Sequence, residues 1–316
     1  MKGLYLLAKM VVEKKFPDDA HLRPFYISAM YGLLCKYKNY AELVCDLFLK
    51  TDIIMDNKPV SEILVDHNID IEFGDEDTEN ERTYAVSNQG HLFIYDEKTD
   101  SILYDKENPF IICSTMDVSM THLLNTFCHE MNHIIKGEIN GYRLHRMNKD
   151  YEYYLRTGLA HYIYKYNDKE DSLTEYQQFS NIDEAVNCIQ TTEIMKEILN
   201  LRSIVDDHEM KSFFELLDEE KMIKDHGYED IVINVRKLWE CDSFKKAIEE
   251  GLIDGDIDHI IRRFNKLIDD DEGFWKLNNI IDTLNSIFFD EEMTEYYKTE
   301  EMKKLNEMVK KLKKSR

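Results

Sequence analysis

Residues 121–137, THLLNTFCHEMNHIIKG, decide how the rest of the chain is interpreted, because His129, Glu130 and His133 have the spacing of a helical metal site. Residues four apart lie one above the other on an α-helix, so His129 and His133 can point at one cation with Glu130 beside it. Two neutral imidazoles and a third protein ligand hold Zn²⁺ with one coordination position left for water. The stretch therefore predicts a helix that carries a zinc site, with Glu130 as the general base.

The apolar residues around these three recur at helical spacing and predict the buried side of the helix. They are Leu123, Leu124, Phe127, Met131, Ile134 and Ile135. Ser119 or Asp117 is suited to cap the start of the helix, and Gly137 is suited to end it.

The composition indicates a folded protein and excludes some classes of partner. With 316 residues, 43% of them hydrophobic, the chain is long enough to bury a large core. Its formal charge of −23 repels phosphate backbones and argues against a nucleic-acid-binding protein. The apolar run at residues 1–16 is interrupted by Lys9 and lacks a signal-peptide cleavage site, and no later run approaches the roughly 20 residues of a membrane span. The six cysteines include no CxxC pair and indicate buried free thiols in the cytoplasm.

The hydrophobic pattern predicts an α+β fold that is predominantly helical. We expect an N-terminal helical lobe and acidic loop at residues 1–82, a core at 83–200 and a C-terminal helical lobe at 201–316. Within the core, residues 83–114 are rich in β-branched and aromatic residues and predict a small antiparallel sheet of two to four strands before the metal helix. The last strand, 110–114, is either an exposed edge that could pair with an extended peptide or an ordinary buried strand.

Further elements follow from the same pattern. Residues 155–166 predict a strand, residues 180–201 a helix, and the region beyond 200 helices alone. The last helix should place Leu305, Met308, Val309 and Leu312 on one side and dock by that side, which is favoured over a membrane-surface role. The acidic residues 74–82 predict a solvated loop. A calcium loop is disfavoured there, because Asn80 replaces the glycine and Val86 the bidentate glutamate that it needs.

The third zinc ligand must come from elsewhere in the chain. The pattern HExxHxxGxxH is excluded because Ile139 stands where it needs histidine. The remaining solution is a carboxylate from a later helix, and the segment NIDEAVN at residues 181–187 supplies it. We expect Glu184 to be the third ligand, with Asp183 as the alternative.

In HEMNH, in the strands before it and in DEA at residues 183–185, the chain resembles the gluzincins, the thermolysin-like zinc metallopeptidases. Their glutamate ligand lies in a similar NEA or NEG segment. The resemblance covers about residues 83–200 and implies a zincin-like core that hydrolyses peptide bonds in peptide or protein substrates. Cys188 departs from it, because such enzymes often carry an acidic residue there. A weaker likeness to the ImmA/IrrE-type regulatory peptidases conflicts with the longer gap between the two motifs here.

A peptidase also needs a donor for the oxyanion that forms during hydrolysis. Tyr176 is the first candidate, and His161, Tyr162 and Arg156 are the others. Two alternatives to the enzyme remain open. One is a catalytically inactive zincin-fold binding or structural protein, such as a phage-associated or toxin-like protein, and the other is a helical protein without metal.

Overall fold

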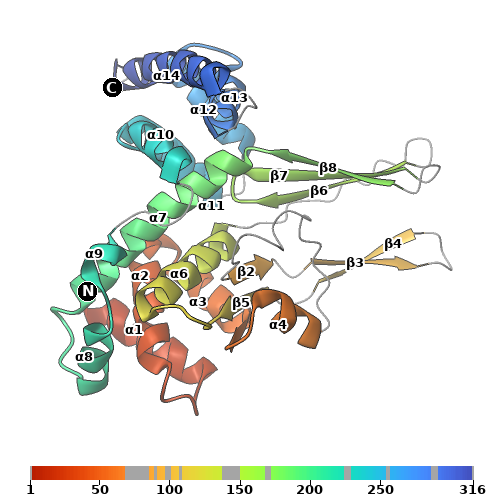
Figure 1. Cartoon of the computed structure of the whole chain (residues 1–316). Coiled ribbons are helices and arrows are strands. Elements are labelled where there is room, and N and C mark those ends of the chain that lie inside the picture. The colour runs from red at the N-terminus through yellow and green to blue at the C-terminus, as the bar shows by residue number, and fades with distance from the viewer. Residues whose placement is uncertain are drawn as a thin grey trace. The chain divides into compact units, whose positions relative to one another are not determined.

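The computed structural model describes residues 2–67, 85–88, 91–96, 101–106, 109–136, 150–167, 172–223, 229–253, 257–285 and 291–314 (Figure 1). It confirms an α+β fold that is predominantly helical. The chain forms two compact units, one of Met1–Ile135 with Gln190–Lys224 and one of Lys136–Ile189 with Asp225–Arg316. The division falls inside helices α6 (Met120–Lys136) and α7 (Ser180–Leu201), so each unit contains part of both helices. The expected division at residues 82 and 200 stays a prediction.

The first unit is built around α2 (Arg23–Lys36), most of which is buried. Gly32 allows the close approach of α7, because a Cβ atom at this position would lie 2.7 Å from Ile198 and 2.8 Å from Ile194. The other helices of this unit are α1 (Lys2–Lys15), the 3₁₀ helix η1 (Lys38–Tyr40), α3 (Ala41–Lys50), α4 (Val60–Asp66), α8 (His208–Glu215) and α9 (Glu219–Met222).

The sheet that precedes α6 is mixed. Strand β5 (Phe110–Ser114) lies between β1 (Asp52–Asp56), to which it is parallel, and β2 (Ala85–Asn88), to which it is antiparallel. The prediction of an antiparallel sheet was therefore wrong for the pairing of β1 with β5. Residues 52–56, within the expected N-terminal helical lobe, form a strand. Because β5 has a neighbour on each side and is largely buried, the exposed-edge interpretation of residues 110–114 is also wrong. Strands β3 (His91–Asp96) and β4 (Ser101–Lys106) form a separate hairpin.

The second unit contains a three-stranded antiparallel sheet in the order β6-β7-β8, formed by Asp150–Thr157, Ala160–Asn167 and Ser172–Gln178. The single strand predicted at residues 155–166 was wrong, because a turn at Gly158 and Leu159 divides that segment between β6 and β7. Gly158 has a φ of +58°, a left-handed conformation that glycine adopts without strain.

Five helices complete the second unit: α10 (Glu229–Trp239), α11 (Asp242–Ile253), α12 (Ile257–Ile268), α13 (Gly273–Asn285) and α14 (Glu291–Lys314). Their apolar faces form one buried cluster, together with the first half of α7. Leu305, Met308, Val309 and Leu312 belong to that cluster, which confirms the predicted docking face of the last helix. The described residues beyond 200 are helical or connect helices, as predicted.

Other expectations have mixed outcomes. Cys113, Cys128, Cys188 and Cys241 are buried free thiols, whereas Cys35 and Cys45 are partly exposed. None of the helices in the described part of the chain is long and apolar enough to cross a membrane. The predicted loop at residues 74–82 and the predicted helix end at Gly137 lie outside the described residues.

Candidate metal centre

Helix α6 forms as its sequence predicts. The Ser119 hydroxyl accepts a hydrogen bond from the backbone N–H of His122 at 3.2 Å, so of the two predicted caps it is Ser119 that acts. All six predicted apolar residues are buried. Among them, Phe127 packs its ring against Phe25 and Tyr26 of α2, with ring centroids 5.4 and 5.8 Å away. This apolar packing fixes which side of α6 turns away from the core.

Buried polar contacts fix the rotation of α6 next to its histidines. Asn132, which is fully buried, accepts a hydrogen bond from the Tyr37 hydroxyl and donates one to the Gln190 side chain at 3.4 Å. Thr121, at the start of the helix, accepts a hydrogen bond from the backbone N–H of Asp218 at 2.8 Å. Because Asn132 directly precedes His133, these contacts hold the ligand-bearing turn of α6 in one orientation.

His129, His133 and Glu184 form a cluster of candidate ligands whose donor atoms all lie within 4.8 Å of one another. The Nε2 atoms of His129 and His133 are 3.1 Å apart. Two ligands of a tetrahedral zinc ion, each about 2 Å from the metal, are separated by roughly 3.3 Å. The donor set of two imidazoles and one carboxylate therefore fits Zn²⁺ in chemistry and in spacing. It leaves room in the coordination sphere for a water or a substrate.

Asp183, the alternative ligand, is engaged elsewhere. Its side chain is buried and accepts a hydrogen bond from the backbone N–H of Leu159 at 2.7 Å. The Lys136 ammonium lies 3.9 Å from the same carboxylate oxygen. Of the two adjacent carboxylates that the sequence offers, Glu184 is the one in the cluster.

Glu130 directly follows His129 on α6 and is partly buried. Burial raises the pKa of the Cys113 thiol in β5 well above its ordinary value, and the charge of Glu130 raises it further. The candidate base is therefore a partly buried carboxylate that directly follows one of the candidate ligands in the sequence.

The candidate oxyanion donors occupy the second sheet. Tyr176 lies on β8 and pairs with Ile163 of β7, while His161 and Tyr162 lie on β7 and Arg156 on β6. The side chains of these four candidates lie outside the described part of the chain. Their roles stay predictions.

Sequence reasoning missed the residues that support the ligands. Asn132, Lys136 and Gln190 are buried polar side chains. Asn132 directly precedes His133, and Gln190 is its hydrogen-bond partner. Lys136 pairs with Asp183, which directly precedes Glu184. A signal was present in the sequence, because a polar residue that recurs on the apolar side of a helix must find a partner. The side chain of Cys188 is buried in the apolar cluster.

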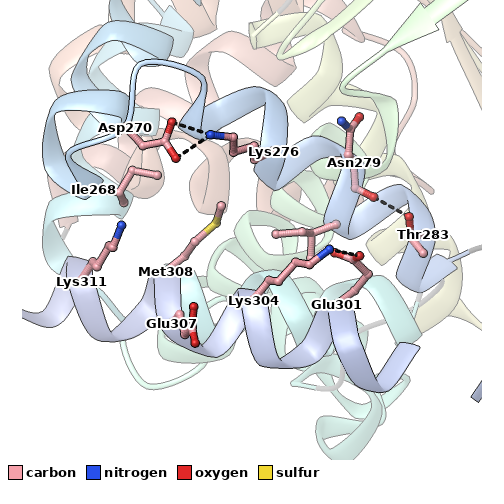
Figure 2. A pocket seen from close by; sticks show the side chains of 11 residues that line it. Ile268, Asp270, Lys276, Asn279, Thr283, Glu301, Lys304, Glu307, Met308 and Lys311 are labelled. Atoms are coloured by element: carbon pink, nitrogen blue, oxygen red, sulfur yellow. Dashed lines mark hydrogen bonds and ion pairs between the residues drawn. The ribbon is translucent and has the colours of Figure 1, made fainter. Parts of the chain in front are cut away.

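The helices of the second unit also form a surface groove of about 470 Å³ between α13, α14 and the end of α12 (Figure 2). Three acidic and three basic residues line it, and four of them form two ion pairs. Lys276 donates to both oxygens of Asp270 at 2.8 Å, and Lys304 donates to Glu301 at 2.6 Å. Such mutual pairing leaves no excess of one charge to attract an ion, so the groove does not indicate a second site.

Comparisons of the chain with protein-family models, curated proteins and solved structures find no match.

Proposed function

We propose that this chain is a zinc-dependent metallopeptidase of the gluzincin type, with a zincin-like core built on α6 and α7. The single observation that supports it best is the cluster of His129, His133 and Glu184, whose donor atoms lie within 4.8 Å of one another. Two histidines from α6 and a glutamate from the distant segment at the start of α7 come together with the donor chemistry that zinc takes in peptidases. In this proposal they hold one Zn²⁺ ion.

The chemistry requires a metal, a base and an oriented substrate. A zinc ion held by this cluster would serve as the Lewis acid that polarises a peptide carbonyl and acidifies a water molecule. Glu130 then accepts the proton of the attacking water and delivers it to the leaving nitrogen. Its place directly after His129 suits a residue that carries this proton from the water to the leaving nitrogen.

The substrate class follows from the same proposal. A peptide or protein is the expected substrate, and Tyr176 is the proposed donor to the oxyanion. The acidic surface argues against nucleic acid as a partner. We also propose a cytoplasmic location, in line with cysteines that form no disulfide among the described residues.

The test is the Glu130→Gln variant, assayed beside the wild type on an unfolded protein such as casein. Glutamine has the same shape but cannot take up the proton, so we expect turnover to fall at least about 100-fold while zinc content stays the same. Glu209→Gln, an exposed residue of α8, is the matched control and should retain full turnover.

Two outcomes separate the alternatives. Equal turnover by the wild type and Glu130→Gln would contradict the proposed mechanism. Bound zinc without hydrolysis by either protein would favour the inactive zincin-fold binding protein.

A further inference from the structure

A buried ion pair joins the two helix segments that carry the candidate ligands. Lys136 is the last residue of α6, and Asp183 lies in the first turn of α7. The side chains are 0% and 2% exposed, and the Lys136 Nζ atom lies 3.9 Å from Oδ1 of Asp183. The ion pairs Lys50–Asp46 and Lys303–Glu300, by contrast, are exposed and contribute little.

The carboxylate of Asp183 also holds the turn between β6 and β7. It accepts the Leu159 N–H at 2.7 Å, and a Cβ atom on Gly158 would lie only 2.2 Å from its Oδ1 atom. The turn backbone therefore approaches the carboxylate so closely that only glycine fits. One buried acid thus connects the end of α6, the start of α7 and the hairpin.

The position of this pair in the sequence relates it to the metal cluster. Lys136 follows His133 by three residues, which is just under one turn of α6, and Asp183 directly precedes Glu184. A charge pair with both partners buried tolerates little displacement, because either charge alone in the interior is strongly unfavourable. Any shift of the α6 end relative to the α7 start must therefore strain the pair.

We propose that Lys136 and Asp183 are positioning residues of the metal centre, which set the spacing between His133 on α6 and Glu184 on α7. This inference rests on the proposed function, since it assumes that the cluster binds zinc. Lys136 also holds the carboxylate of Asp183 away from the cluster, so that Asp183 does not join the two histidines and Glu184 as a further ligand. Residues that orient metal ligands typically change metal affinity 10- to 100-fold when they are replaced.

The test measures the zinc dissociation constant by competition with a chromophoric chelator, for variants whose circular dichroism shows a folded chain. Lys136→Met keeps the length of the side chain without the charge, and Asp183→Asn keeps the acceptor for the Leu159 N–H. We expect each to raise the dissociation constant at least 10-fold. Lys136→Arg, which keeps the charge, should stay within about threefold of the wild type.

Two further variants keep the test decisive. The double variant Lys136→Met/Asp183→Asn leaves no isolated buried charge, so it is expected to fold where a single variant fails, and its dissociation constant should also rise at least 10-fold. Ile281→Ala removes a buried side chain from the apolar cluster of the same unit and should lower thermal stability without changing zinc affinity.

The outcomes distinguish this inference from the proposed function. A wild type that binds zinc, with a double variant that binds it equally tightly, would overturn the positioning role and leave the metal site intact. Equal loss of affinity in Ile281→Ala would also overturn it, because the effect would then be general destabilisation. A folded wild type that takes up no zinc would overturn both.

Discussion

The helix pair α6 and α7 and the bundle α10–α14 bury different kinds of side chain. Among the described residues, the two helices of the pair bury many polar groups: Thr121, Asn125, Asn132, His133, Lys136, Asp183, Asn187, Gln190, Thr191 and Thr192. In the described part of the bundle, Asn278 is the buried polar residue, and the rest of its interior is aliphatic or aromatic. Buried polar groups cost free energy unless they are hydrogen-bonded, so their concentration on one helix pair needs a reason. The proposed metal centre with its supporting contacts would supply that reason, whereas the bundle needs only packing.

The largest expected change in the free energy of unfolding comes from a core substitution in the bundle α10–α14. Phe264 of α12 is fully buried and packs between Phe244 and Phe274, with ring centroids 5.7 and 5.5 Å away. Phe264→Ala should lower the free energy of unfolding by about 3–5 kcal/mol because it leaves a large cavity. The two tryptophans of the chain, Trp239 and Trp275, lie in α10 and α13, so their fluorescence during urea unfolding reports the bundle. Zinc content should be unchanged, and loss of zinc in this variant would contradict the separation of roles.

Removal of the metal should act on the helix pair. A ligand that binds the folded state at 100 times its dissociation constant stabilises that state by about 2.7 kcal/mol. A chelator should therefore lower the melting temperature of the wild type, followed by far-ultraviolet circular dichroism. His133→Ala serves as the control and should melt at the same temperature with and without chelator. Equal sensitivity of both proteins would show that the stabilising metal lies elsewhere.

A smaller effect is expected where a polar contact of the pair is removed. Asn132→Ala leaves the Tyr37 hydroxyl and the Gln190 amide without their buried partner and should cost about 1–3 kcal/mol in the free energy of unfolding. Asn285 is exposed and donates a hydrogen bond to Asn181 at 3.2 Å, so Asn285→Ala is a matched control with an expected change within about 0.5 kcal/mol. Urea unfolding of the two variants measures the difference, and equal costs would contradict a special role for buried polarity in the pair.

The smallest effect concerns the exposed groove of the bundle. The hydrogen bond from Lys276 is the largest of the influences that lower the pKa of Asp270 below its ordinary value. The folded state therefore favours the carboxylate, and the resulting stability is present above the unfolded pKa of about 3.9 and is lost as the pH falls through the lower folded pKa. Because the pair is exposed, the stability difference between the wild type and Asp270→Asn should be small at neutral pH and should vanish in strong acid. Thermal melts of both proteins from neutral pH to strong acid measure it, and a difference that grows towards acid would contradict this assignment.

The sequence predicted structural features that depend on neighbouring residues better than those that depend on distant parts of the chain. The apolar side of α6 and the bounds of α7 follow from helical spacing, and the structure confirms them. The sequence left Ser119 and Asp117 open as caps of α6, and the structure shows Ser119 in that role. The central place of β5 and the turn at Gly158 did not follow. The first depends on pairing with β1, more than 50 residues earlier, and the second on a single left-handed glycine inside a run that reads as one strand.

The site shows the same limit. Spacing within α6 predicted His129, Glu130 and His133 together, and the sequence favoured Glu184 with Asp183 as the alternative. The contacts that engage Asp183 could not be predicted, because the hairpin turn and Lys136 approach it from other parts of the chain. Likewise, no periodicity in α6 alone shows that Asn132 meets Tyr37 and Gln190. Long-range partners decide which polar residue is a ligand and which is a support.

The most direct test of the metal centre is elemental analysis of the purified protein after dialysis against a weak chelator. The wild type, His133→Ala and the control His208→Ala, an exposed histidine at the start of α8, are measured together. The proposal predicts about one zinc per chain in the wild type and in His208→Ala, and close to none in His133→Ala. A folded wild type that holds no zinc, and takes up none when zinc is added back, would contradict it.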